Sequence, residues 1–537
     1  MISADYAALV PVFVLVGAGA LVPLFGAFRA RPGFLAAFSA IAIVVAMLFS
    51  LASVFDIGGL SLGHGGFMPD AKTTVLSFSL LELTPFVVLF DLVFLSVALI
   101  VVLASPRYIQ PRHQGEYYSL LLLSTVGMMM VAASRDLITL FVGLELSSFC
   151  TYALAGFFKN RSESSEAALK YFLVGSISSS LAIFGISLVY ALTGSTSFVA
   201  LGQFWGHTMN IACTSASGVC PVVPGALTLG GKFPIGVFTW ALLLAGFGYK
   251  IAMVPFHNYA VDVYEGAPNT VSGFLAAGSK QMGFAALFKV FLLGLFAVKA
   301  NWDVAVGVLA IITMIVGNVA ALRQTNIKRM LAYSSIAQAG YILIALVVAA
   351  NPDSAIGSYA LAGGMFHIVT YSFMKAGAFV ALAAVATWGI GEEMSDWKGM
   401  GKRSPFIALA MTLFLLSFAG IPPLAGFASK FTLFSGAIQA GVAASGPWYG
   451  YQLLYFGLAG VGILTSAISL VYYWRLIRVM YVEEGEGRHV AVNGSAAIAV
   501  GVALAGTVLL GLFPAFAYDM SVNAATHLFS AVAAIGP

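Results

Sequence analysis

Long apolar runs alternate with short polar connections along nearly the whole chain. A helix needs about 20 mainly apolar residues to cross a bilayer, and fourteen runs have roughly that character. The predicted spans are 7–28, 35–56, 83–104, 117–133, 137–158, 166–193, 234–255, 268–296, 302–322, 330–350, 358–386, 404–440, 452–480 and 494–516. Polar stretches at 57–82 and 196–232 are interpreted as linkers. The pattern predicts an all-α integral membrane protein in which residues 1–537 form a single polytopic domain.

The composition supports this class. Hydrophobic residues make up 60% of the chain and charged residues only 9%, with a mean hydropathy of +0.97, whereas soluble domains carry about 25% charged residues. The 57 glycines fit close approach of membrane helices. Basic residues are scattered among short loops, so we expect no nucleic-acid partner and take the lipid bilayer as the surrounding medium.

The positions of the basic residues predict the orientation. Loops after odd-numbered spans contain fifteen Lys and Arg, and the opposite loops contain four. The fifteen are Arg29, Arg31, Arg107, Arg112, Lys159, Arg161, Arg323, Lys328, Arg329, Lys398, Lys402, Arg403, Arg475, Arg478 and Arg488, and they define the basic-loop face. Because cytoplasmic loops carry the excess of Lys and Arg, both termini are predicted to lie on the outer face of the cell membrane.

The remaining six basic residues lie inside predicted spans, and all six are lysine. They are Lys170, Lys250, Lys280, Lys289, Lys375 and Lys430. Arginine keeps its proton in proteins, whereas a buried lysine can alternate between the charged and neutral forms. Ionisable groups inside a membrane are costly and usually serve a transport route or a partner group. The pattern therefore predicts a set of proton-exchanging sites.

Glu145 is the one carboxylate of the apolar stretch LFVGLELSSFCTYALAGFF at 140–158. It fits a structural ion pair that serves packing, or a charge that controls the proton affinity of a lysine. Lys170 lies in the next span, which runs antiparallel to the first. We predict Lys170 as the partner of Glu145.

Two spans are predicted to break inside the membrane. Pro255 follows Lys250, and the pair Pro422 and Pro423 precedes Lys430. Proline removes a backbone donor and clashes with the preceding turn, and broken helices are tolerated where they line a polar cavity. The mirrored order predicts two inverted five-helix repeats, 117–296 and 302–480, with broken helices 7 and 12. Three helices in 1–110 precede them and a last helix at 494–516 follows. Kinked helices without a transport role are the alternative.

Other intramembrane lysines and histidines are further candidates. Lys280 is predicted to be a central relay site. Lys289 lies nine residues further on and fits either a relay or an anchor whose ammonium group reaches the interface. His367 and Lys375 share one helix face and fit a proton wire, although a hydrogen-bonded core histidine remains an alternative for His367.

Two further groups are less clearly assigned. His257 follows the break at Pro255 and fits either a cap of the break or a relay. Asp91 is a lone carboxylate in an apolar span, with no obvious partner in the sequence.

The sequence contains no Walker motif, no GxGxxG after a strand, no haem or iron–sulfur spacing and no nucleophile elbow. Its three cysteines, Cys150, Cys213 and Cys220, form no metal-binding pattern. Cys213 and Cys220 share one loop and fit either a disulfide or two free thiols. We therefore expect no metal and no cofactor in this chain.

Three stretches of the sequence resemble a known family. These are DLITLFVGLELSSFCTYALAGF, SEAALKYFLVGSISSSLAIFGISLVYALTGST and KIAMVPFHNYAVDVYEGAP. They are similar to the antiporter-like subunit N of the complex I family, which includes NADH–quinone oxidoreductases and F(420)H(2) dehydrogenases. FHIVTYSFMKAGAF departs from the usual wording of subunit N and is closer to the sister antiporter-like subunits.

The resemblance implies a role for particular residues. It matches Glu145 to the family's fifth-helix glutamate and Lys170 to its sixth-helix partner. It also matches Lys250, Lys280 and Lys430 to the lysines of the broken seventh helix, the eighth helix and the broken twelfth helix.

The function implied is a non-redox, proton-translocating subunit of an NADH- or F(420)H(2)–quinone oxidoreductase. Its expected partners are the antiporter-like subunit M, small membrane subunits and a peripheral redox arm. Quinone, iron–sulfur clusters and flavin are expected in those partner subunits. A subunit of a multisubunit Na⁺/H⁺ antiporter and a non-transporting membrane scaffold are the alternatives.

Overall fold

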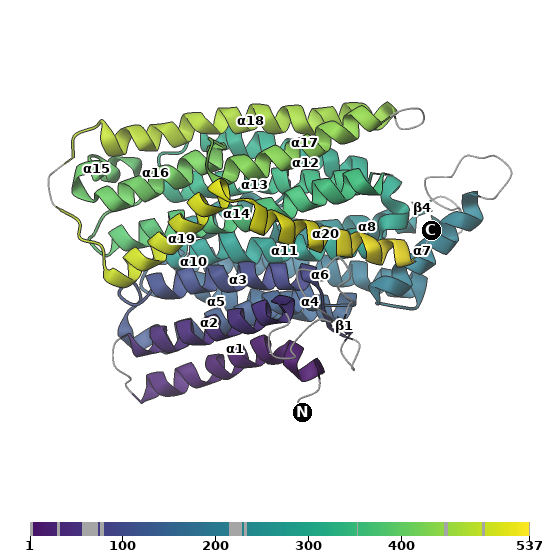
Figure 1. Cartoon of the computed structure of the whole chain (residues 1–537). Helices are drawn as coiled ribbons and strands as arrows, with labels where there is room; N and C mark the ends of the chain where they lie inside the picture. The colour runs from purple at the N-terminus through teal and green to yellow at the C-terminus, as the bar shows by residue number, and fades with distance from the viewer. Residues whose placement is uncertain are drawn as a thin grey trace.

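The computed structural model is a bundle of many helices that lie side by side and roughly parallel to one another (Figure 1). It describes residues 4–28, 33–55, 74–75, 80–213, 228–229, 233–351, 353–444, 449–485 and 489–535. Cys220 and the side chain of Cys213 lie outside the described residues, so the pairing of these two cysteines stays a prediction.

Eleven helices of the described chain are long and apolar enough to cross a membrane. They are α1 (Ala4–Ala27), α2 (Phe34–Phe55), α3 (Pro85–Ala104), α4 (Gln114–Ala133), α5 (Leu137–Ala155), α6 (Ser162–Thr193), α12 (Asp303–Ala321), α13 (Ile327–Ala349), α14 (Ser354–Ala386), α18 (Tyr449–Tyr481) and α19 (Gly494–Leu512). Each coincides with a predicted span to within a few residues, because uninterrupted apolar runs of this length leave the backbone no other way to satisfy its hydrogen bonds in lipid.

The other helices are shorter or interrupted. They are α7 (Phe198–Cys213), α8 (Ile235–Lys250), α9 (Asn258–Gly266), α10 (Asn269–Phe274), η3 (Leu275–Ser279), α11 (Lys280–Phe288), η4 (Lys289–Gly294), α16 (Pro405–Ala419), α17 (Ala425–Ala443) and α20 (Ala515–Ile535). Short 3₁₀ or α turns occur at η1 (Pro111–His113), η5 (Phe296–Asn301), η6 (Met394–Trp397) and α15 (Met400–Arg403). Two small antiparallel ladders pair β1 (Thr74–Val75) with β2 (Glu82–Leu83) and β3 (Thr228–Leu229) with β4 (Phe233–Pro234).

Both predicted helix breaks are confirmed. Helix α8 ends at Lys250 and α9 begins at Asn258, which places Pro255 in the interruption. Helix α16 ends at Ala419 and α17 begins at Ala425, with the two prolines between them.

Two helices lie where the sequence pattern predicted none. Helix α7 occupies part of the stretch interpreted as a linker, and α20 follows the last predicted span. Both contain polar residues that interrupt their apolar runs, so neither is recognised as a span. Helix α20 packs against α3 and α14, so tertiary contacts rather than a continuous apolar run stabilise it.

Among the eleven long apolar helices, α13 and α14 are the most buried, and every residue of the shorter helix α11 is buried as well. Figure 1 shows the loops around α15 at one end of the bundle, and the two chain ends at the other. The basic loops and the termini therefore lie at opposite ends of the helices.

Close helix contact depends on glycine at particular positions. A Cβ atom built on Gly127 of α4 would lie 2.6 Å from the backbone nitrogen of Ser147 and 2.7 Å from the carbonyl oxygen of Gly143, both in α5. Backbone atoms cannot move aside as a side chain can, so these two helices must separate if the position gains a methyl group.

We predict that Gly127→Ala destabilises the protein by about 1–3 kcal/mol, the usual cost of overpacking a closely packed core. Gly460→Ala in α18 is the control, because nothing lies within 4 Å of that Cβ position. The measurement is the thermal unfolding midpoint of the purified protein in detergent. Equal midpoints for the two variants would contradict the close approach of α4 and α5.

Candidate functional site

Four of the predicted lysines and His367 lie in a buried polar row through the middle of the bundle. We call this row, made of Lys250, Lys280, Lys375, His367 and Lys430, the lysine axis. Each of its side chains is buried. Among the described residues, none of the four ammonium groups has a carboxylate oxygen within 4 Å, so neutral groups supply their hydrogen bonds.

Lys250 stands at the end of the axis nearest Glu145. Its ammonium nitrogen donates to Ser148 Oγ at 2.6 Å. Ser148 lies three residues after Glu145 on α5, and the Glu145 carboxylate interacts electrostatically with Lys250. Glu145 itself accepts a hydrogen bond from Ser179 Oγ at 2.5 Å. Lys250 is therefore the lysine whose charge Glu145 can influence.

The predicted ion pair between Glu145 and Lys170 is wrong. Lys170 Nζ lies 2.6 Å from Asp262 and 2.7 Å from Glu166, and its side chain is 41% exposed. The register of the antiparallel helices explains this, since Ser179 lies opposite Glu145. Lys170 is nine residues away from Ser179, or about 14 Å along α6 at 1.5 Å per residue. It belongs to the charged surface near the basic loops.

Lys280 lies at the centre of the axis, on the helix that runs from α10 to η4. Its ammonium nitrogen donates to Ser335 Oγ at 2.7 Å and to the Ser335 carbonyl at 3.0 Å. Ser335 Oγ lies 2.6 Å from the hydroxyl of Tyr371, which continues the hydrogen-bonded chain into α14. The π-helical turn η3 ends immediately before Lys280, and such turns are frequent at functional positions.

Lys375 and His367 lie on one face of α14 with Tyr371 between them. Lys375 Nζ donates to the Leu331 carbonyl at 2.9 Å and to Ser334 Oγ at 3.1 Å, and it lies 5.5 Å from the Tyr371 ring centroid. The two predicted residues do share a face, but they do not bond directly.

His367 has a partner on each ring nitrogen. Nδ1 lies 2.9 Å from Ser429 Oγ, and Nε2 lies 2.9 Å from Gln338 Oε1. The Ser429 hydroxyl can donate to the ring or accept from it, whereas the Gln338 amide oxygen can only accept, so Nε2 is the donor in that contact. The ring therefore connects α13 with α17.

Lys430 uses the backbone that the second helix break leaves free. Its ammonium nitrogen donates to the Phe418 carbonyl at 2.6 Å and to Ser466 Oγ at 2.8 Å. The last carbonyls of a helix have no partner within that helix, so the end of α16 supplies an acceptor at the centre of the bundle. Gly420 caps α16 at φ +86°, and a Cβ there would lie 3.3 Å from Lys430 Cδ.

Residues of helix α13 contact Lys375, Lys280, His367 and Lys430 in succession along the helix. Leu331 and Ser334 bind Lys375, Ser335 binds Lys280, and Gln338 binds His367. The Tyr341 ring centroid then lies 4.7 Å from Lys430 Nζ. These positions recur every three to four residues, so they share one face of a helix. The sequence signal was available in AYSSIAQAGY, where small polar residues interrupt an apolar run, but their partners could not be assigned from spacing.

His257 lies apart from the axis. It precedes α9 at the first helix break and is half-buried, and its Nδ1 has no hydrogen-bond partner among the described residues. Its side chain is hydrogen-bonded to the Pro255 backbone in the break, and its role as a cap or a relay stays a prediction.

A model of the NADH:quinone oxidoreductase/Mrp antiporter transmembrane family matches residues 134–445 of the chain. The chain belongs to this family. The matched range contains Glu145 and every member of the lysine axis.

Two relatives that match most of the chain support the assignment to this family. F(420)H(2) dehydrogenase subunit N of Methanosarcina mazei is 41% identical, over 97% of this chain and 98% of the relative. NADH-quinone oxidoreductase subunit N of Trichlorobacter lovleyi is also 41% identical, over 82% and 84% of the two chains.

Solved structures have the same fold. A chain of respiratory complex I from Thermus thermophilus superposes with a TM-score of 0.72 at 28% identity, covering 95% of this chain and 98% of that chain. A chain of an archaeal membrane-bound sulfane sulfur reductase gives 0.78 at 23% identity, over 99% and 100%. A chain of the Mrp complex from Dietzia gives 0.79 at 19%, over 100% of both. At these last two identities the likeness shows the fold alone.

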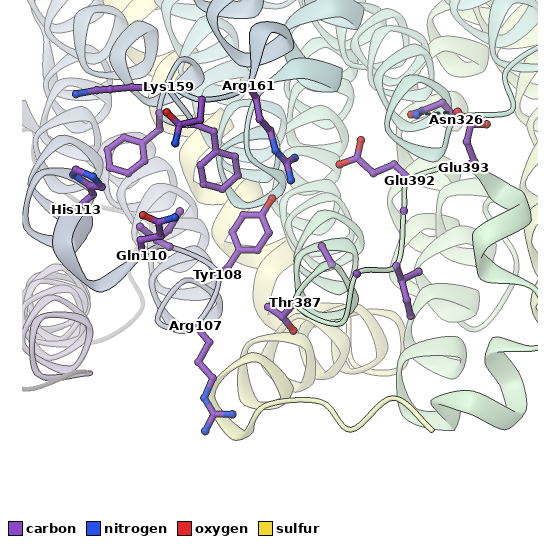
Figure 2. A pocket seen from close by; sticks show the side chains of 18 of the residues that line it. Arg107, Tyr108, Gln110, His113, Lys159, Arg161, Asn326, Thr387, Glu392 and Glu393 are labelled. Carbon is purple, nitrogen blue, oxygen red and sulfur yellow. Dashed lines mark hydrogen bonds between the residues drawn. The ribbon is translucent and has the colours of Figure 1, made fainter. Parts of the chain in front are cut away.

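Two charged cavities open at the basic-loop face of this family member. In the larger, of about 830 Å³, Arg161, Glu392 and the Tyr108 hydroxyl point toward one another (Figure 2). The second, of about 630 Å³, shares Arg161 and Glu392 and contains Lys170 and Lys328. Burial raises the pKa of Tyr108, so this phenol stays protonated at neutral pH.

Lys328 joins the second cavity to the axis. Its buried ammonium nitrogen donates to the Ala267 carbonyl at 2.7 Å and lies 3.3 Å from Glu392. Lys328 is in the first turn of α13, and Leu331, one turn later, already binds Lys375. In the described part of the chain no group of three His, Cys, Asp or Glu side chains could hold a metal ion.

We predict that Glu145 couples to Lys250 and not to Lys170. In a double-mutant cycle, Glu145→Gln and Lys250→Met should deviate from additivity by about 0.5–3 kcal/mol, the range for interacting neighbours. Glu145→Gln and Lys170→Met should be additive, because their partners differ. The measurement is thermal unfolding of the four purified proteins of each cycle. Coupling in the second cycle alone would restore the pair predicted from sequence.

Proposed function

We propose that this chain is the proton-translocating membrane subunit N of a complex I-type quinone oxidoreductase, and that it carries protons along the lysine axis. The observation that carries the proposal is the row of buried ammonium groups held by neutral acceptors. A lysine with a carboxylate partner is held in its charged form, whereas one bound by serine and carbonyl oxygens is free to exchange its proton.

The relatives supply the context of the proposal. They are named as subunits N of NADH-quinone oxidoreductase and F(420)H(2) dehydrogenase. We infer that electrons are handled in partner subunits, where quinone, iron–sulfur clusters and flavin would reside. The partners would include a sister antiporter-like subunit M, small membrane subunits and a peripheral redox arm.

We also propose fourteen membrane passes, built from three N-terminal helices, two inverted repeats at 117–296 and 302–480, and a last pass containing α19. The opposite course of the two broken helices supports the repeats. Helix α8 runs toward its break from the end that holds the termini, whereas α16 runs toward its break from the basic-loop face. Placing the basic loops in the cytoplasm puts both termini on the outer face of the cell membrane.

Protons would reach the axis from the two charged cavities. Lys328 and Glu392 lie at the floor of the smaller cavity, one helical turn from the Leu331 carbonyl that binds Lys375. The protons would then pass among Lys375, Lys280, His367 and Lys430 through the serine, tyrosine and glutamine groups of α13 and α14. Glu145 would act on Lys250 by charge, since the two interact across α5 and α8.

Lys280→Ala should leave the complex assembled and stop most of the proton transfer through this chain. Because proton transfer by a positioned group is worth about 10²–10⁴-fold, we expect at least a hundredfold loss of the protons that this chain contributes. The measurement is the ratio of protons translocated to quinone reduced in proteoliposomes. Lys398→Ala is the control, since Lys398 is 46% exposed and pairs with Glu483 at the basic-loop face. A normal ratio in assembled Lys280→Ala would favour a scaffold.

The set of copurifying proteins separates the complex I-type function from an antiporter. We expect mild detergent extraction of the tagged chain to recover iron–sulfur and quinone-reducing subunits. Recovery of small membrane subunits alone, in a preparation that exchanges Na⁺ for protons, would identify a multisubunit antiporter instead.

A further inference from the structure

Asp91 is a buried carboxyl group that the lysine axis does not use. It lies in α3 with 6% of its surface exposed, and its Oδ1 has no hydrogen-bond partner among the described residues. A buried polar atom without a partner is rare and calls for an explanation. The residue lies on the side of Lys280 away from the basic loops.

The helix register places Asp91 between Lys280 and Lys289. Helix α3 runs antiparallel to the helix that contains α11. A Cβ on Gly278 would lie 3.5 Å from Val97, and Lys289 Nζ lies 5.7 Å from the Phe86 ring centroid. Both contacts fix the same register, which sets Asp91 level with Phe284. Measured along the helix direction, Asp91 is then about 6 Å from the level of Lys280 and about 8 Å from the level of Lys289.

Lys289 lies in a buried ion pair, so its ammonium group does not reach the interface as the predicted anchor would. Its buried ammonium nitrogen lies 2.8 Å from Glu82 Oε1 and donates to the Ser134 carbonyl at 2.7 Å. Such a pair holds the lysine in its charged form. The Lys289 ammonium group also interacts electrostatically with the Asp91 carboxyl group.

A small cavity lies between Asp91 and Glu82. Both residues line a small cavity of about 20 Å³ beside α1 and α4, which is enough for one water molecule. Glu82 is 16% exposed and lies 3.8 Å from Arg135. His527 of α20 interacts electrostatically with both Glu82 and Lys289. Asp91 and Glu82 are thus the titratable groups that line the cavity, and Lys289, Arg135 and His527 interact with Glu82.

Gln281 is a second buried polar residue near Lys280. It follows Lys280 in α11, is fully buried, and has no partner for either amide atom among the described residues. Buried amide groups of this kind are usually completed by water. Gln281 is therefore a buried polar side chain beside Lys280 that could bind water on a route from Lys280 to Asp91.

We propose that Asp91 is the proton-release group of this chain, at the end of the bundle opposite the basic loops. A proton leaves the Lys280 ammonium group, which becomes neutral, and binds the Asp91 carboxylate. It then passes through the small cavity to Glu82 and out, and the Lys289 charge restores the Asp91 carboxylate. The proposal rests on the proton-translocating function proposed above.

The test compares Asp91→Asn with Lys280→Ala in the assembled complex, reconstituted in proteoliposomes. Asparagine keeps the shape of aspartate but cannot exchange the proton. We expect Asp91→Asn to lower the ratio of protons translocated to quinone reduced to the value found for Lys280→Ala, and Asp91→Glu to restore much of it. The double variant should be no lower than either single variant, because both act on one route.

Asp303→Asn is the matched control. Asp303 is also buried, but it accepts a hydrogen bond from the Val304 backbone at 2.6 Å at the start of α12, a role that asparagine can fill. It should leave the ratio unchanged.

A normal ratio in Asp91→Asn, together with a lowered ratio in Lys280→Ala, would overturn the release site and leave the proposed function intact. Normal ratios in both would overturn the function itself. If Asp91→Asn fails to assemble, labelling of the wild-type complex with dicyclohexylcarbodiimide decides, because this reagent modifies protonated carboxyl groups in apolar surroundings. Labelling at Asp91 that blocks translocation supports the proposal, and its absence contradicts it.

Discussion

Each buried ammonium group in this protein must find acceptors inside an apolar bundle, and that requirement shapes the structure around the lysine axis. An isolated charge in such surroundings is prohibitively costly. Lys280 is satisfied by Ser335, Lys375 by Leu331 and Ser334, and Lys430 by Phe418 and Ser466. Serine hydroxyls and freed carbonyls supply this without the fixed negative charge that would prevent proton exchange.

The second helix break follows from the same requirement. In an unbroken helix each interior carbonyl already accepts one hydrogen bond from its own helix, whereas the end of α16 leaves carbonyls without a helical partner. The interruption at Pro422 and Pro423 exposes the Phe418 carbonyl, and Ser466 also donates to the neighbouring Ala419 carbonyl at 3.0 Å. The break leaves carbonyl groups without helical partners, and the Lys430 ammonium group needs acceptors, so the two satisfy each other.

Carboxylates are placed away from the middle of the axis. Glu145 acts near Lys250, Glu392 lies beside Lys328 at the basic-loop face, and Glu82 holds Lys289 toward the opposite end. A carboxylate next to Lys280 would hold that lysine charged. Lys280 itself is thus bound by neutral groups, while these three carboxylates lie farther along the proposed route.

The apolar pattern alone determined that this is a helical membrane protein, and it located the long spans and both breaks. Lipid leaves few choices to a long apolar run, and proline cannot continue a helix. It missed α7 and α20, whose stability depends on packing against other helices. The choice of lysine over arginine at six positions inside predicted spans pointed to the candidate residues, including Lys250, Lys280, Lys375 and Lys430.

Only the tertiary structure decided which of these residues meet. Lys170 is adjacent in sequence order to the helix of Glu145, yet the register of α5 and α6 sets Ser179 there instead and leaves Lys170 to Asp262. Ser335, Gln338 and Asp91 carried no distinctive spacing, because their roles depend on residues 29–198 positions away in other helices. Spacing along one helix fixes which face a side chain occupies, but the depth at which two helices align is set by packing of their whole surfaces.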